Sequence, residues 1–276
     1  MNDGVRLLLG FAAGGLAVAA TTLLAERHGS RLGGYIGGLP STLAVALLFV
    51  ALTGGRDAAI RASGIAPLSF GINGLYVLLF VALTPLGFYW SMGLALAAWA
   101  AAQSAIIIHG APPLTFSLAA WGICFGLCWL GFSRWFRVPP QPSTGLSTGA
   151  GILLLRTTVS GALVAAAAAA SLWWGAVAGG VLASLPVVFI CSLFIAYRRL
   201  GLAFARALAG SLVFSAVINC TAFALLFRLA LRHLDIFPAF ASAYAATLLA
   251  AWPLYHLNLG SPSDGAPTAR TEAPNR

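Results

Sequence analysis

The stretch that decides the fold is Gly33-Gly34-Tyr35-Ile36-Gly37-Gly38-Leu39-Pro40-Ser41-Thr42, because a degraded copy follows 146 positions later, Gly179-Gly180-Val181-Leu182-Ala183-Ser184-Leu185-Pro186. In both copies a glycine pair precedes Leu-Pro near the start of a long apolar segment. Proline removes a backbone hydrogen-bond donor and crowds the preceding turn of a helix. Each copy therefore predicts a broken or kinked helix.

The same offset relates residues along three apolar segments without a gap. Matches of Ala or Leu are common by chance in such a chain, so the evidence for a repeat comes mainly from matching Gly, Pro, Ser and Asn residues. At an offset of 146 positions the pairs are Gly33 with Gly179, Gly34 with Gly180, Pro40 with Pro186, Gly64 with Gly210, Ser69 with Ser215, and Asn73 with Asn219. The chain is therefore expected to be a tandem duplication.

The composition is that of a membrane protein. Hydrophobic residues make up 60% of the chain and charged residues 8%, and the mean hydropathy is +0.94. Average proteins carry roughly 25% charged residues, and a membrane-spanning helix needs about 20 apolar residues. The apolar segments therefore predict an all-α, polytopic membrane protein with about nine helices, within a range of about eight to ten, and the lipid bilayer as its partner.

Four parts are expected along the chain. Residues 1–132 form a first repeat with about five spans, and residues 150–259 form a second repeat with about four. Residues 133–149, rich in Pro, Ser and Gly, form the linker between them. Residues 260–276 form a polar tail that is expected to be disordered. Within the first repeat, a short amphiphilic connection around Arg61 is expected between the second and third apolar segments.

An odd number of spans in the first repeat makes the second repeat enter the membrane from the opposite face, so the repeats are expected to be inverted. With the amino terminus outside, ten arginines lie at inner segment ends or in the tail and five lie at outer ends. Cytoplasmic loops carry an excess of basic residues. We therefore expect a multi-pass protein of the bacterial inner membrane, with its amino terminus outside and its carboxyl tail in the cytoplasm.

This architecture resembles the five-plus-five inverted-repeat secondary transporters, such as those of the drug/metabolite transporter type. The resemblance lies in span count and repeat length, covers most of the chain, and assigns no individual residue. It implies a substrate site near the bilayer midplane between the repeats, built from interrupted helices in corresponding positions. The two Leu-Pro segments fit that description.

Two pairs of polar residues recur inside the apolar segments. Ser69 and Asn73 are four positions apart and share one helix face, and Ser215 and Asn219 repeat the pair. Such residues act as interhelical hydrogen-bonding groups worth about 0.6–2 kcal/mol or mark a substrate pathway, and both readings stay open. The candidate substrate-binding residues are Pro40, Ser41, Thr42, Ser69, Asn73, Ser184, Pro186, Ser215 and Asn219.

Small residues surround both Leu-Pro segments. Glycine allows helices to approach closely in a membrane, and it also permits a flexible gate or an exposed backbone at a binding site. The candidate packing or gating residues are Gly33, Gly34, Gly37, Gly38, Gly179 and Gly180.

Several other kinds of chemistry lack support in the sequence. No Asp or Glu falls in the middle of a predicted span, which argues against a proton relay built from carboxylates. All four cysteines lie in apolar segments without zinc-site spacing, so no metal and no cofactor are expected. The net charge of +9 is spread over segment ends rather than gathered on one face, so no nucleic-acid partner is expected.

The sequence therefore predicts a small-molecule secondary transporter, with a site near the midplane between two inverted repeats. A structural or assembly protein that transports nothing is the first alternative. A membrane enzyme is the second, and its best cluster would be Glu26 with His28, yet the histidines lie near segment ends and form no HExxH spacing. The chain is accordingly expected not to be an enzyme, while its substrate and oligomeric state cannot be read from these patterns.

Overall fold

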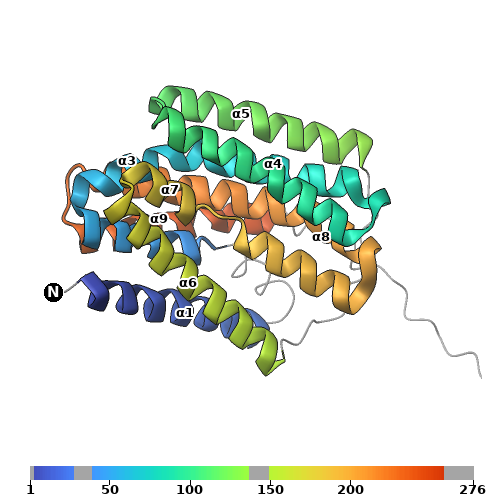
Figure 1. Ribbon diagram of the computed structural model, residues 1–276, viewed down its shortest axis with the longest axis horizontal. Coiled ribbons are helices and arrows are strands. Elements are labelled where there is room, and N and C mark those ends of the chain that lie inside the picture. Colours follow the sequence, from blue (N-terminus) through green and yellow to red (C-terminus); the bar gives the residue numbers. More distant parts are fainter. Residues whose placement is uncertain (1–2, 28–38, 137–148, 258–276) are drawn as a thin grey trace, which may run out of the picture.

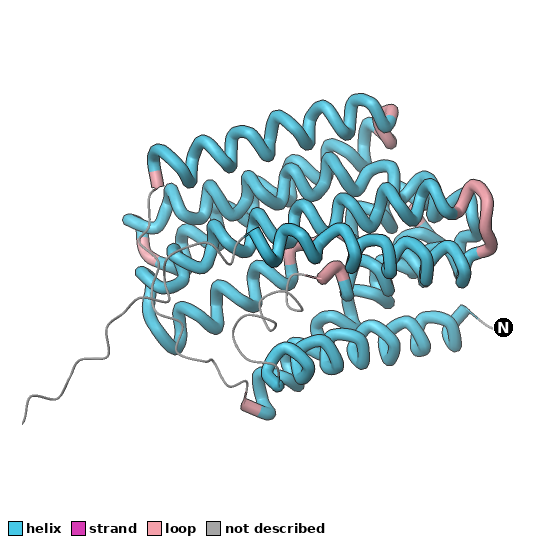
Figure 2. Tube along the Cα trace, turned by 180° about the vertical axis from the view of Figure 1, so that it is seen from behind, coloured by secondary structure: helices cyan, strands magenta, loops and turns pink. Residues whose placement is uncertain are grey.

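The computed structural model describes residues 3–27, 39–136 and 149–257, and all regular structure in these ranges is helical (Figures 1 and 2). The helices are α1 (Asp3–Arg27), α3 (Ser41–Leu83), α4 (Phe88–His109), α5 (Leu114–Leu130), α6 (Ala150–Trp173), α7 (Ala176–Ala183), α8 (Val187–Ala230) and α9 (Ile236–Leu257). A 3-10 turn (Thr84–Leu86) follows α3, and a π-helical turn (Gly131–Trp135) follows α5. The predicted all-α fold class is confirmed.

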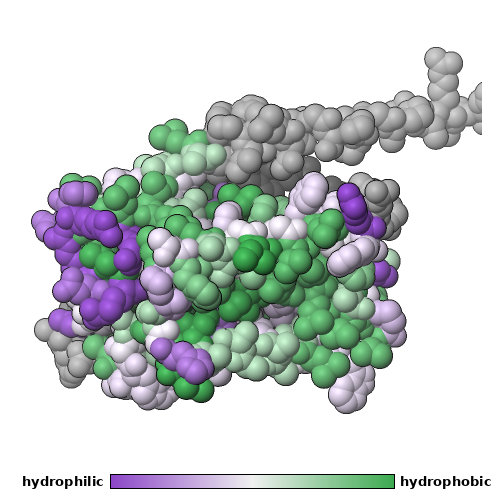
Figure 3. Space-filling view, turned by 90° about the horizontal axis from the view of Figure 1, so that it is seen from above, coloured by the Kyte–Doolittle hydropathy of each residue, from purple (hydrophilic) through white to green (hydrophobic). Residues whose placement is uncertain are grey.

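Six helical stretches of the described chain are long and apolar enough to cross a membrane. Apolar side chains cover the middle of the molecular surface in Figure 3, and hydrophilic side chains gather toward one end. Large apolar residues with at least two thirds of their surface exposed include Leu8, Trp90, Ile108, Leu154 and Leu249. Apolar surface of this extent is stable against lipid rather than water. The chain is therefore a multi-pass integral membrane protein.

Two glycines divide the longest helices. Gly55 in α3 has φ 82° and ψ 174°, and Gly201 in α8 has φ 83° and ψ 179°. Side chains other than glycine rarely adopt positive φ. Gly87, Gly110 and Gly175, which join consecutive helices, have similar positive φ values. Gly55 and Gly201 are therefore turns, and each separates a shorter first segment from a longer second segment of its helix.

The first of these turns precedes the stretch around Arg61. The short amphiphilic connection expected around Arg61 is helical, because α3 resumes directly after Gly55. Ala58, Ala59 and Ala62, which lie in the first turns of the second segment of α3, are buried. The stretch has one exposed, charged side and one buried side, and a single glycine with positive φ makes the turn before it.

The predicted helix break is confirmed in the second copy of the Leu-Pro stretch. Helix α7 ends at Ala183, and α8 begins at Val187 after Pro186, whose φ and ψ are −77° and 41°. In the first copy, α3 begins at Ser41 after Pro40, which has a φ of −77° and a ψ of 40°. The glycines before Leu39 lie outside the described residues. The two prolines thus start their helices with the same backbone conformation.

Helices α3 and α8 form the core of the molecule. Figure 1 places α4 and α5 along one side of them and α1 with α6 along the other. The largest side chains that are almost completely buried come mainly from α3 and α8, and they include Tyr76, Phe80, Phe223, Phe227, Leu47 and Leu193. This core positions the beginnings of α3 and α8, at Pro40 and Pro186, inside the protein rather than at its surface.

Helices α1 and α6 pack through two reciprocal glycine contacts. A Cβ atom placed on Gly161 would lie 2.5 Å from the backbone oxygen of Phe11, and one placed on Gly15 would lie 3.1 Å from the backbone oxygen of Thr157. Gly15 and Gly161 differ by 146 positions, as do Phe11 and Thr157. In one contact the glycine comes from α6 and the carbonyl from α1, and in the other contact the matching positions have these roles reversed.

Replacing Gly161 with Val is expected to destabilise the fold by about 1–3 kcal/mol, because the new side chain would overlap the backbone of α1. Gly151→Val in the same helix is the matched control, since nothing lies within 4 Å of a Cβ at that position. Thermal unfolding in detergent measures the difference. Equal melting temperatures for the two variants would contradict the close α1–α6 contact.

Candidate functional site

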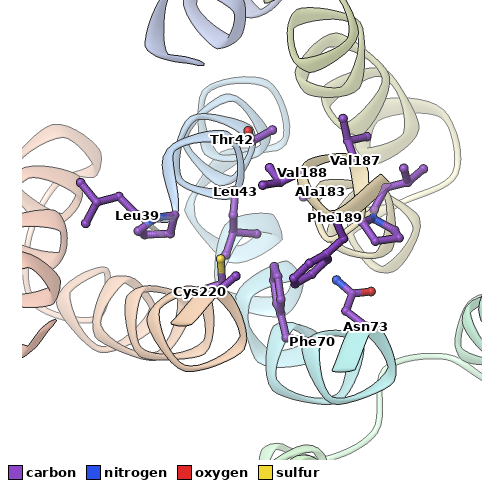
Figure 4. A pocket seen from close by; sticks show the side chains of 14 residues that line it. Leu39, Thr42, Leu43, Phe70, Asn73, Ala183, Val187, Val188, Phe189 and Cys220 are labelled. Carbon is purple, nitrogen blue, oxygen red and sulfur yellow. The ribbon is translucent and has the colours of Figure 1, made fainter. Parts of the chain in front are cut away.

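A cavity of about 40 Å³ lies where α3 and α8 begin (Figure 4). Its wall includes Pro40 and Pro186, together with the first turns of the helices that they start. The second segments of α3 and α8 complete it with Phe70, Asn73, Ala216 and Cys220. A space of this size is large enough for water molecules or a small ion. It is the feature nearest to the site predicted between the two Leu-Pro stretches.

Most of the cavity wall consists of residues separated by 146 positions. Ten of the fourteen described lining residues form five such pairs. The pairs are Leu39 with Leu185, Pro40 with Pro186, Thr42 with Val188, Leu43 with Phe189, and Phe70 with Ala216. The cavity is therefore surrounded by matching positions from the two halves of the chain.

Asn73 joins the core to the break between α7 and α8. Its side chain is fully buried, and its Nδ2 donates a hydrogen bond of 2.7 Å to the backbone oxygen of Ser184. In a continuous helix that oxygen would accept the amide of residue 188. Asn73 instead satisfies a carbonyl that the break has released. An unpaired backbone group in a membrane interior costs several kcal/mol, so this contact stabilises the broken helix.

Trp99 fixes the orientation of the Asn73 amide. Its Nε1 donates a hydrogen bond of 2.6 Å to Asn73 Oδ1. Because an indole nitrogen only donates, the acceptor must be the amide oxygen. The amide nitrogen is therefore directed to Ser184, and one of its two protons forms that bond.

A second polar pair lies one helical turn away. Ser69 Oγ donates to Gln103 Oε1 at 3.1 Å, and Gln103 Nε2 donates to the backbone oxygen of Ser69 at 3.4 Å. Gln103 follows Trp99 by four positions, so both face α3 from α4. Neither Trp99 nor Gln103 was among the residues predicted from the sequence. A glutamine inside an apolar segment was the available signal, because intramembrane amides need partners.

The two helix starts on the cavity wall have the same backbone bonding. Ser41 N donates to Leu39 O at 2.8 Å, and Val187 N donates to Leu185 O at the same distance. One turn later, Ala44 and Ile190 donate to the carbonyls of their respective prolines. The remaining first-turn amides of a helix have no intrahelical acceptor. Polar donors therefore border a cavity whose side chains are mostly apolar.

Thr42 adds a buried hydroxyl beside this wall. Its side chain is 6% exposed, and Oγ1 has no hydrogen-bond partner among the described residues. Thr53, Thr84 and Thr247 behave differently, because each donates to a backbone carbonyl three or four positions earlier in the chain. Thr42 thus keeps a buried hydroxyl without a partner in the described chain, beside the cavity but not exposed to it.

The structure brings part of the predicted substrate-binding set together. Pro40, Thr42, Asn73 and Pro186 line the cavity. Ser184 lies beside it in the break, and its Oγ donates to the carbonyl of Val181. The remaining candidates, Ser41, Ser69, Ser215 and Asn219, are on α3 and α8 but are not among the lining residues.

The predicted packing glycines of the second copy lie in close contacts. A Cβ on Gly179 would lie 2.6 Å from Cβ of Ser171, and one on Gly180 would lie 2.9 Å from Cα of Ala62. Both distances favour a packing role for this pair. The corresponding candidates of the first copy, Gly33, Gly34, Gly37 and Gly38, lie outside the described residues.

Comparison with known proteins identifies no family. No protein-family model matches the chain, and no match was found among the curated proteins or the solved structures. Function must therefore be argued from the cavity and the helices around it. Among the described residues, no three His, Cys, Asp or Glu side chains are grouped closely enough to hold a metal ion.

Replacing Asn73 with Ala is expected to loosen the break, because the carbonyl of Ser184 and the indole of Trp99 both lose their partner. A buried group without a partner costs about 1–3 kcal/mol. Hydrogen exchange measured by mass spectrometry should become faster in peptides that cover residues 182–190. Peptides from α5 serve as the internal control and should not change. Unchanged exchange around the break would contradict the assigned role of Asn73.

Proposed function

We propose that this protein is a secondary carrier of a small solute, in which two inverted units alternate around the cavity. The observation that supports the proposal best is the pairing of the cavity wall, where five pairs of residues at an offset of 146 positions line one cavity. Carriers with inverted repeats bind their substrate at the interface of the units, between interrupted helices. The paired proline starts at this cavity match that arrangement.

Further features at the same offset support two related units. The proline starts at Pro40 and Pro186 and the glycine turns at Gly55 and Gly201 each differ by 146 positions and share their backbone angles. Helix α6 begins 147 positions after α1 and α8 begins 146 after α3. We take residues 1–132 and 150–259 as the two units, with α4 and α9 in corresponding places and α5 present only in the first unit.

The glycine turns support about nine membrane crossings. Helix α7 and the first segment of α8 cover residues 176–200, which suffices for one crossing interrupted in its middle. The second segment of α8 then crosses in the other direction after Gly201. If α3 likewise crosses twice, once before and once after Gly55, the number of crossings is odd. The two ends of the chain then lie on opposite sides of the membrane. The arginine bias favours an amino terminus outside and a carboxyl tail in the cytoplasm of a bacterial cell.

An aromatic stack closes one end of the proposed pathway. The rings of Phe88 and Tyr197 lie parallel with their centroids 4.1 Å apart, and they join the start of α4 to the first segment of α8. Tyr197 is two helical turns from Phe189, which lines the cavity. Separation of these rings would open the cavity toward the cytoplasmic end. The small cavity then corresponds to the closed state of a carrier.

The carrier proposal predicts two conformations at this end of the protein. Spin labels at Trp90 and Arg198, both exposed, are expected to give two distance populations in lipid nanodiscs, measured by pulsed electron paramagnetic resonance. Tyr197→Ala should increase the longer-distance population, because it removes the stack. The four native cysteines are first replaced by Ala. Labels at Phe116 and Ile123 in α5 are the control and should give one population.

A single distance that Tyr197→Ala leaves unchanged would contradict a carrier and favour the alternative of a structural or assembly protein. The result does not depend on knowing the solute. It therefore tests the class of function separately from the identity of the substrate.

A further inference from the structure

We propose that the groove between α6 and the first segment of α8 binds one anionic phospholipid, with an acyl chain on its apolar wall and the phosphate at Arg198 and Arg199. The groove has a volume of about 220 Å³ and shares no lining residue with the cavity at the two helix starts. This inference does not depend on the proposed carrier function. The described lining residues are Ile152 and Leu155 from α6, and Phe194, Ile195, Arg198 and Arg199 from α8.

The groove runs along the two helices and opens toward the outside of the protein. Phe194 and Arg198 are four positions apart, as are Ile195 and Arg199, so the lining follows one broad face of α8. Leu155 is 47% exposed and Phe194 is 37% exposed, whereas Ile195 is buried. Exposed apolar surface of this kind marks contact with lipid. The apolar wall is therefore suited to an acyl chain.

The two arginines lie at one end of this groove. Both are exposed, and they are the last lining residues before the turn at Gly201. A Cβ atom placed on Gly149, the residue that precedes α6, would lie 3.9 Å from Nη2 of Arg199. The guanidinium of Arg199 thus lies where α6 begins. Arginine stems cover apolar surface while the guanidinium groups stay at the polar interface, so the groove changes from apolar to cationic along its length.

A third arginine lies between the same two helices. Arg156 follows the lining residue Leu155, and its Nη2 donates a hydrogen bond of 3.5 Å to Oγ of Ser192 in α8. The two acids whose side chains the structure describes are Asp57, near the start of the second segment of α3, and Asp235, just after α8. Each is separated from the arginine end of the groove by a whole helix segment. The described charged side chains around the groove are therefore all positive.

An anionic phospholipid matches both parts of the groove. Basic pockets between transmembrane helices bind anionic lipid head groups, and a guanidinium forms two parallel hydrogen bonds to a phosphate. Phosphatidylcholine has the same chains and phosphate, but its quaternary ammonium would lie near the arginines. Free phosphate would make no use of the apolar wall. Phosphatidylglycerol is therefore the probe, and phosphatidylcholine with identical acyl chains is the comparison.

Removing the two arginine charges tests the head-group end of the site. The full chain is titrated in detergent with each lipid, and native mass spectrometry gives the dissociation constant of the first bound lipid. Phosphatidylglycerol is expected to bind more tightly than phosphatidylcholine. Arg198→Gln combined with Arg199→Gln should weaken phosphatidylglycerol binding about 25-fold, since each basic residue near an anionic lipid contributes about fivefold.

Arg56→Gln combined with Arg61→Gln is the matched control for charge. Both residues are exposed, and their replacement removes two positive charges from a different part of the molecule. Binding of phosphatidylglycerol should not change in this variant.

Filling the groove tests its apolar part while the arginines stay in place. Leu155→Trp is expected to weaken binding about tenfold, as when two methylene groups of the lipid lose their contact. Leu154→Trp is the matched control, because Leu154 is 67% exposed and does not line the groove. The melting temperature of each variant without added lipid shows that it is folded.

Equal binding of the two lipids by the native protein, or equal weakening in the two double-arginine variants, would overturn the lipid site. Glycerol phosphate added as a competitor distinguishes a lipid from a small phosphate. If glycerol phosphate displaces phosphatidylglycerol at similar concentration and Leu155→Trp has no effect, the arginines bind a phosphate group alone and the lipid is rejected.

Discussion

The structure depends on how a helix can be broken inside a membrane without leaving its backbone unpaired. Pro186 interrupts the helical hydrogen bonds between α7 and α8. The carbonyl oxygen of Ser184, which this interruption frees, accepts a hydrogen bond from the side-chain amide of Asn73. Trp99 holds that amide in place from α4. Both hydrogen bonds lie in the core, where no water substitutes for a lost partner. The break is therefore a fixed feature of the fold, with the cavity beside it as its consequence.

The sequence predicted the position of the break at Pro186 but not the partners that stabilise it. A Leu-Pro pair in an apolar segment interrupts a helix for a local reason, so its effect could be read directly. Asn73 was identified as an intramembrane amide that needs a partner, whereas its acceptor is a backbone carbonyl 111 positions away. Partners of this kind depend on tertiary packing. For the same reason Trp99 was missed, because tryptophan in an apolar helix carries no sign of a hydrogen bond.

The turns at Gly55 and Gly201 show a second limit of sequence reasoning. Glycine is common in this chain, with 31 residues, and most glycines lie inside helices. Only the tertiary fold distinguishes a glycine that permits close packing, such as Gly161, from one that makes a turn through positive φ. The offset of 146 positions between Gly55 and Gly201 was a signal that both make turns, since both follow an apolar segment that begins at a proline.

We propose that the helix starts at Pro40 and Pro186, which line one cavity, belong to two matching helix breaks at the same depth of the membrane. A structure of the protein in lipid nanodiscs, determined by electron cryo-microscopy, tests this most directly. The account predicts helices interrupted at both Pro40 and Pro186 near the bilayer midplane, with Asn73 bound to the carbonyl of Ser184. Continuous helices through either proline, or breaks located in different leaflets, would contradict it.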